Sequence, residues 1–177
     1  MVIDSDVAVG KAYQRPQVKE KLTEWWGGQV LLPNRQVNRK EIARRVFNDE
    51  HERRRLEALI HPIVAEIRDE QMRQSAGDAS VKAYVWDTPL LLEAGLGGQC
   101  DAIVYVDAPE EERLERVRRT RGWDEAELHR REKLQMPLDK KLDMANDIVR
   151  NTAGADDEVR NQVRKVLSRI LAGIRRP

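Results

Sequence analysis

The stretch VIDSD (residues 2–6) decides the fold class that the sequence predicts. Val2 and Ile3 are typical of the end of a buried strand, and Asp4 and Asp6 follow with one residue between them. Two later apolar runs, AYVWD (83–87) and AIVYVD (102–107), also end in an aspartate, and DIVRN (147–151) is typical of a short last strand. Because helical stretches separate these runs, the sequence predicts an α/β protein with a parallel sheet.

Acidic side chains at strand ends are the first candidates for chemistry. Ligands of open parallel sheets bind beyond the carboxyl ends of the strands, where this sequence places Asp4, Asp6, Asp87 and Asp107. A carboxylate there can accept a proton from a substrate hydroxyl or hold a metal through water. A single aspartate can instead cap the following helix, which is the interpretation that we favour for Asp107. Two acids as close as Asp4 and Asp6 are more than one helix cap needs.

Local signals also predict where helices begin and end. Asn38 precedes Glu41 by three residues, as Asp49 precedes Glu52, and both patterns indicate helix starts. Gly27 is expected to end the helix that carries the preceding tryptophans, which we assign to the core. Pro62 interrupts an apolar stripe that runs from residue 56 to 67, so we expect a break or a new helix start there.

Composition limits the classes of partner. The chain has 177 residues, expected to form one domain, with 32 Lys and Arg against 31 Asp and Glu and a net charge of +1. We therefore expect neither nucleic acid nor a membrane as a partner. Cys100 is the single cysteine, which suits a reducing compartment. We predict a cytoplasmic protein that is a monomer or a small homo-oligomer.

The arginine-rich stretch from Glu112 to Gln135 has two interpretations. Acid and base pairs four residues apart, such as Glu112 with Arg116, favour a solvated helix held by ion pairs. However, Arg121-Gly122-Trp123 should break that helix and leave two charged arms joined by a tip. Such a pair of arms is typical of a lid that closes cations over phosphates.

Several segments together resemble the dephospho-CoA kinase family, which are P-loop kinases related to the nucleoside monophosphate kinases. These segments are VIDSD, NRKEIARRVF, LEALIHPIV, VWDTPLLLEAGL, AIVYVDAPEEERLERVRRTRG and LQMPLDKKLDMANDIVRNTAG. The resemblance spans nearly the whole chain and implies a three-layer fold with a helical lid at about residues 112–140 and a helical CoA-side region at about 11–75. It implies transfer of the γ-phosphoryl of ATP, with Mg²⁺, to the ribose 3′-hydroxyl of dephospho-CoA, the last step of coenzyme A biosynthesis.

The resemblance also implies roles for single residues. Asp6 would be the general base, and Asp87 matches a strand-end acid of Walker B type; no residue is given as a direct metal ligand. The acceptor side would be shaped by Arg39, His61, Pro62, Leu90, Leu91 and Glu93. Contacts to nucleotide and phosphate would come from Arg121, Lys141 and Asn151.

The sequence departs from the family pattern at two places. Ala145-Asn146 stands where the family has Ala-Asp, and no G-x-x-x-x-G-K-S/T phosphate loop is found. Gly10-Lys11 cannot serve, because Ala12 and Tyr13 follow it and it comes after the acids. We therefore expect a first strand and a phosphate loop to be missing ahead of Met1, and the chain as it stands to be inactive.

Two other classes of function stay open on sequence grounds. One is another kinase of the nucleoside monophosphate type, which would share the lid and the strand-end acids. The other is a non-catalytic protein, either a remnant that binds CoA or a nucleotide or a helical module that meets an acidic partner.

Overall fold

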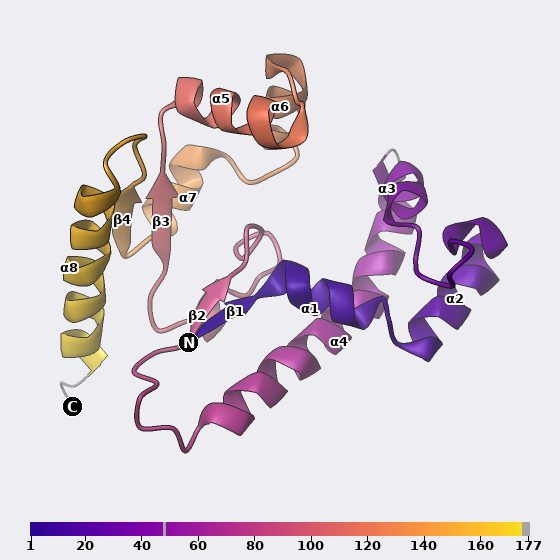
Figure 1. The fold of residues 1–177 in the computed structure, drawn as a ribbon, viewed down its shortest axis with the longest axis horizontal. Helices are drawn as coiled ribbons and strands as arrows, with labels where there is room; N and C mark the ends of the chain where they lie inside the picture. Colours follow the sequence, from indigo (N-terminus) through magenta and orange to yellow (C-terminus); the bar gives the residue numbers. More distant parts are fainter. Residues whose placement is uncertain (48, 175–177) are drawn as a thin grey trace. The chain divides into compact units, whose positions relative to one another are not determined.

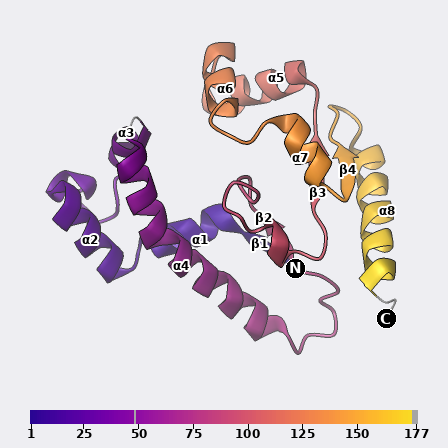
Figure 2. The ribbon, with the colours of Figure 1, turned by 180° about the vertical axis from the view of Figure 1, so that it is seen from behind.

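The computed structural model describes residues 1–47 and 49–174. The chain divides into two compact units, Met1–Pro89 and the part that begins at Leu90. Figure 1 shows the elements of both units, and Figure 2 shows them from behind. Helices alternate with short parallel strands, which confirms the predicted α/β class.

The first unit contains one parallel pair of strands, β1 (Val2–Asp4) and β2 (Val85–Asp87). Their register places Val2 opposite Val85 and Asp4 opposite Asp87. We predicted a buried strand here. Ile3 is buried, with 2% of its surface exposed, but Val2 is 64% exposed. Successive side chains of a strand point to opposite faces, and the described elements cover only the face that carries Ile3.

Helices form the rest of this unit: α1 (Ser5–Ala12), α2 (Pro16–Trp26), the 3-10 helix η1 (Gly28–Val30), α3 (Arg39–Phe47) and α4 (Glu50–Ser75). α4 packs against both α1 and α3. Their shared core consists of Ala12, Val18, Leu22, Trp26, Val30, Ile42, Leu56 and Ile60. The caps predicted at Asn38 and Asp49 are confirmed, since Asn38 accepts from the Glu41 N–H at 3.3 Å and Asp49 from the Glu52 N–H at 3.0 Å. The cap favoured for Asp107 is wrong, because the helix that begins at Glu110 has Pro109 as its N-cap and no side-chain cap hydrogen bond.

The predicted break at Pro62 is wrong, because α4 continues from Glu50 to Ser75 with Pro62 inside it. A proline in a helix removes one backbone hydrogen bond and costs about 3 kcal/mol. Here the apolar stripe continues on both sides of the proline: Ile60 is 5% exposed, and Ile63 and Ile67 pack against the same core. Burial along the whole stripe offsets the cost of the missing hydrogen bond.

The second unit contains the parallel pair β3 (Val104–Asp107) and β4 (Asp147–Arg150), which places Asp107 opposite Arg150. Its helices are η2 (Gly97–Gln99), α5 (Glu110–Arg121), α6 (Glu125–Glu132), α7 (Leu138–Met144) and α8 (Asp156–Ile174). α8 packs against β4, and these elements can be followed in Figure 1. Gly122 has φ 67° and ends α5, which confirms the predicted break in the arginine-rich stretch.

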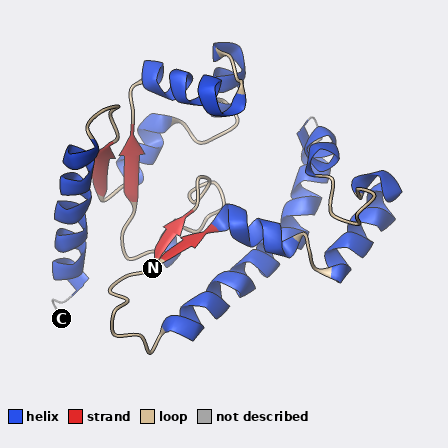
Figure 3. Cartoon of the chain, viewed as in Figure 1, coloured by secondary structure: helices blue, strands red, loops and turns tan. Residues whose placement is uncertain are grey.

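The described strands form two separate two-stranded sheets, coloured red in Figure 3, instead of the one sheet that the sequence suggested. No described strand makes hydrogen bonds to both pairs. Within the described ranges, none of the helices has the length and the apolar character that crossing a bilayer requires.

Candidate active site

The carboxyl ends of β1 and β2 bring together the acids that the sequence singled out in the first unit. Asp4 and Asp87 are register partners, so their side chains end neighbouring strands. The residue that follows each strand carries a hydroxyl, and Ser5 Oγ lies 2.5 Å from Thr88 Oγ1. Sequence reasoning missed this hydroxyl pair, which fixes the two chain segments where they leave the sheet.

Asp4 and Asp6 have different surroundings. Asp4 is the N-cap of α1, and its Oδ1 accepts a hydrogen bond from the Val7 N–H at 3.0 Å. Asp6 lies in the first turn of the same helix, is exposed, and has no partner among the described residues. The capping role is thus filled by Asp4, which leaves the Asp6 carboxylate available to a ligand.

Arg39, predicted to lie on the acceptor side, is held against α1. Its guanidinium carbon lies 5.5 Å from the centre of the Tyr13 ring. Gly10 faces the same side chain, because a Cβ built at this position would come within 3.0 Å of Arg39 Nη2. Burial raises the pKa of the Tyr13 hydroxyl, against the opposing effect of the Arg39 charge. The hydroxyl therefore stays protonated at neutral pH.

His61 and Pro62 are both exposed on α4. Within residues 1–47 and 49–174, no hydrogen bond or ion pair joins either of them to Arg39. Their contribution to an acceptor pocket therefore stays a prediction.

In the second unit, Asn151 follows directly after β4 and is held by a hydrogen bond from α5. Its backbone N–H donates to the Asp107 carbonyl oxygen at 2.7 Å. Its own carbonyl oxygen accepts from Arg116 Nη2 at 2.8 Å, and the same nitrogen lies 3.0 Å from Glu112 Oε2. The Glu112–Arg116 pair predicted from helical spacing is thus confirmed, and its arginine also holds the loop after the last strand.

Glu93 and Lys141, to which the sequence gave separate roles, form an ion pair at 2.7 Å. Lys141 Nζ also donates to Gln135 Oε1 at 3.0 Å, and Glu93 Oε1 accepts from the Met136 N–H at 2.9 Å. Burial raises the pKa of the Glu93 carboxyl, but the hydrogen bonds from Lys141 and Met136 outweigh it and hold that pKa below its ordinary value. Leu90, earlier in the same turn, is exposed, and Leu91 is half-buried.

The tip of the arginine-rich arms gathers cations around Trp123. The guanidinium carbons of Arg121 and Arg131 lie 4.8 and 4.1 Å from its ring centre. Each contact is a cation–π interaction, which restrains a long side chain without neutralising its charge. The arms are further tied by Arg113 and Glu132 at 3.1 Å, a cross-helix pair that i,i+4 spacing could not reveal.

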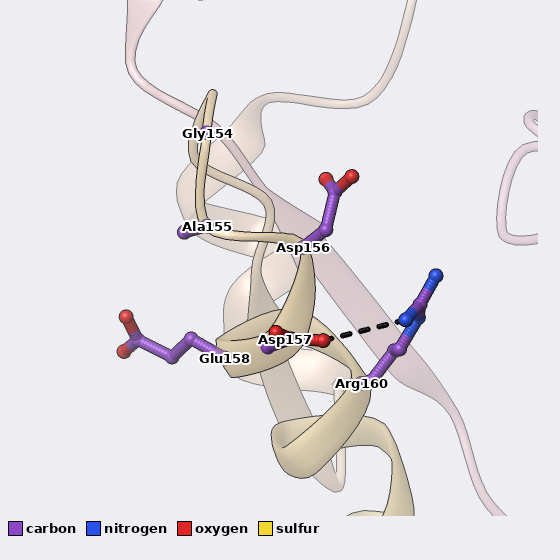
Figure 4. Close-up of a pocket in the computed structure, with 6 residues that line it drawn as sticks. All are labelled: Gly154, Ala155, Asp156, Asp157, Glu158 and Arg160. Atoms are coloured by element: carbon purple, nitrogen blue, oxygen red, sulfur yellow. Dashed lines mark hydrogen bonds and ion pairs between the residues drawn. The ribbon is translucent and has the colours of Figure 1, made fainter.

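Two surface hollows are lined by residues other than the predicted site residues. One, of about 590 Å³, is lined by the turn at Gly154 and the start of α8 (Figure 4). Asp157 pairs with Arg160 there at 3.3 Å, whereas Asp156 and Glu158 point in other directions. The other, of about 420 Å³, adjoins the end of α6 and the start of α7. Acids in the first turn of α8 are explained by the positive end of the helix dipole.

One group of side chains could meet around a metal ion, namely Glu110, Glu125 and His129, whose ligand atoms lie within 4.8 Å of one another. His129 Nε2 already lies 2.8 Å from Glu110 Oε1. Both glutamates are exposed. The His129–Glu110 hydrogen bond explains why His129 and Glu110 lie close together without a metal.

Known proteins resemble the chain along most of its length. The family model for dephospho-CoA kinase matches residues 1–157. The dephospho-CoA kinase of Anaeromyxobacter dehalogenans is 35% identical over 174 residues, which are 97% of this chain and 81% of the relative. That of Syntrophotalea carbinolica is 34% identical over 157 residues, 89% of this chain and 74% of the relative.

Solved structures agree with these sequence matches. The crystal structure of TT1252 from Thermus thermophilus has a TM-score of 0.80 at 28% identity, covering 95% of this chain and 83% of that one. Dephospho-CoA kinase from Campylobacter jejuni has a TM-score of 0.65 at 22% identity, covering 97% and 85%. The fold and these matches thus define an α/β protein of the kinase class, a phosphotransferase. More specifically, the chain belongs to the dephospho-CoA kinase family.

Proposed function

We propose that the protein transfers the γ-phosphoryl of ATP to the ribose 3′-hydroxyl of dephospho-CoA. Membership of the dephospho-CoA kinase family supports this activity. The single observation that carries the mechanism is the free carboxylate of Asp6 beside the end of β1, where the neighbouring Asp4 already caps the helix.

In the proposed reaction Asp6 accepts the proton of the 3′-hydroxyl. The resulting oxygen forms a bond to the γ-phosphorus, the bond from that phosphorus to the β,γ-bridging oxygen breaks, and ADP leaves. Phosphoryl transfer needs positioning and neutralised charge more than covalent help. One exposed carboxylate at the right place is therefore sufficient as the proton acceptor.

A magnesium ion, when bound with ATP, would neutralise charge on the phosphate oxygens. Exposed carboxylates are the oxygen ligands that Mg²⁺ prefers, usually through water. Asp87, which ends β2, provides such oxygens. We therefore propose that it holds the hydrated ion.

We propose that the two substrates are held by the residues that the family resemblance indicates. Arg121 and Lys141 would meet phosphate oxygens, and Asn151 would lie near the adenine of ATP. The acceptor would be bound by Arg39, His61, Pro62, Leu90, Leu91 and Glu93. The fixed position of Arg39 against Tyr13 supports its assignment, because a restrained guanidinium loses less entropy when it binds an anion.

We propose in addition that residues 1–177 act as one catalytic domain and that the protein is cytoplasmic. The single cysteine, Cys100, supports the cytoplasmic location, since it suits a reducing compartment.

The test compares two polypeptides in an assay that follows CoA formed from ATP, Mg²⁺ and dephospho-CoA. One is the 177-residue chain, and the other, the loop-supplied chain, places a strand–loop–helix unit with G-x-x-x-x-G-K-S/T ahead of Met1. We expect little or no CoA from the first, because no backbone cradle for the β- and γ-phosphates is found in its sequence. We expect turnover from the second. Phosphorylation of nucleoside monophosphates in preference to dephospho-CoA would overturn the proposed substrate.

A further inference from the structure

Lys141 is the one charged residue that is buried in the described part of the chain, with a relative exposure of 9%. Removing an ammonium group from water is costly unless acceptors compensate for the lost hydration. Two acceptors do so here, Glu93 Oε1 at 2.7 Å and Gln135 Oε1 at 3.0 Å. The position of the charge is therefore set by two specific partners.

The partners of Lys141 come from different segments. Glu93 belongs to the turn after β2, Gln135 to the connection after α6, and Lys141 itself to α7. Glu93 also binds the backbone of the connection, because its carboxylate accepts a hydrogen bond from the Met136 N–H, 43 residues further along the chain. One carboxylate thus fixes both the ammonium and the backbone that carries its second acceptor.

The ammonium group of lysine has three N–H donors. The described residues use two of them, which leaves the third without a hydrogen-bond partner among the described residues, and the side chain as a whole is 10% exposed. A phosphate oxygen is the acceptor that best matches a positively charged donor in a kinase of this family.

We propose that Glu93 is a positioning residue, which holds Lys141 so that its third N–H meets a phosphate oxygen of the bound substrate. This inference rests on the proposed function, in which Lys141 binds phosphate, and gives Glu93 a further role through Lys141 beside its proposed place on the acceptor side. The alternative is that the pair serves the fold alone. The two roles predict different results when the pair is changed.

The test uses the 177-residue chain labelled with ¹⁵N-lysine and inorganic tripolyphosphate as the probe. A buried, paired Lys141 should give a detectable Nζ signal, and Lys141→Arg identifies it by removing it. We expect tripolyphosphate to shift this signal in the wild type. In Glu93→Gln the affinity for tripolyphosphate should fall by about tenfold or more, because the neutral amide oxygen holds the ammonium more weakly than the carboxylate does.

Three further variants separate positioning from stability. Glu93→Asp keeps the charge with a shorter reach and should bind tripolyphosphate with an intermediate affinity; it decides the matter if Glu93→Gln does not fold. Replacing the pair with apolar side chains, Glu93→Leu with Lys141→Met, should preserve thermal stability but abolish the contribution of this site to binding. Glu24→Gln is the matched control, since Glu24 pairs with Lys21 at 2.8 Å on an exposed surface.

The proposal would be overturned if tripolyphosphate did not shift the Lys141 signal, or if the Glu93→Gln variant bound tripolyphosphate as tightly as the wild type. Neither result depends on turnover. If the loop-supplied chain makes no CoA while the Lys141 signal still responds to tripolyphosphate and Glu93→Gln still binds it more weakly, the proposed function fails and the positioning role of Glu93 stands.

Discussion

Replacing Asp6 with Asn separates proton transfer from folding. The change keeps the size of the side chain and removes its basicity, and loss of a general base lowers kcat by about 10²- to 10⁴-fold, or about 2.7–5.4 kcal/mol in the activation barrier. The cost in stability should be small, because Asp6 is exposed and has no partner among the described residues. What remains is its attraction to the N-terminus of α1, which is worth about 0.3–1 kcal/mol.

Asp4 provides the matched control two residues away. Its carboxylate accepts the Val7 N–H at 3.0 Å, so Asp4→Ala should lower the free energy of unfolding by about 1 kcal/mol. The assay measures kcat for CoA formation in the loop-supplied chain, together with urea unfolding of each variant. We expect Asp6→Asn to lose kcat and keep its stability, and Asp4→Ala to lose stability and retain most of its kcat. A near-normal kcat in Asp6→Asn would remove Asp6 from the role of base.

Three other predictions concern stability and the acceptor side. The pKa of Glu41 lies at about 2, mainly because of the hydrogen bond from Arg44, with a further one from Arg45. Because this pKa is lower in the folded than in the unfolded protein, the ionised Glu41 stabilises the fold at a pH above its unfolded pKa, and this stabilisation is lost as the pH falls toward 2. Thermal unfolding at pH 2–6 should therefore show a gap between wild type and Glu41→Gln that closes at the acidic end. Leu22 is 0% exposed, so Leu22→Ala should lower the free energy of unfolding by about 2–5 kcal/mol in urea titrations, and a loss under 1 kcal/mol would contradict its place in the core. Pro62→Ala should restore a helical hydrogen bond and raise stability by up to about 3 kcal/mol, while the KM for dephospho-CoA rises; an unchanged KM would remove Pro62 from the acceptor side.

The sequence named the residues of the candidate site, whose roles stay predictions, but not how they pair. Acids at strand ends and basic residues in the arginine-rich stretch follow from residue type and position along the chain, so Asp6, Asp87 and Arg121 could be named as candidates without a structure. The pairing of Glu93 with Lys141 could not, because no spacing rule links a turn to a helix that lies well beyond the next strand. The cross-helix pair of Arg113 and Glu132 escaped for the same reason.

The sequence by itself determined the features that depend on neighbours a few residues apart. Caps such as Asn38 and Asp49, and the helix end at Gly122, are local, because each joins groups within one turn of the backbone. The tertiary structure alone decided the features that depend on burial. It kept α4 continuous through Pro62, since the core on both sides of the proline compensates for a lost hydrogen bond. It also made Lys141 a buried charge, which is stable only where distant segments bring acceptors to it.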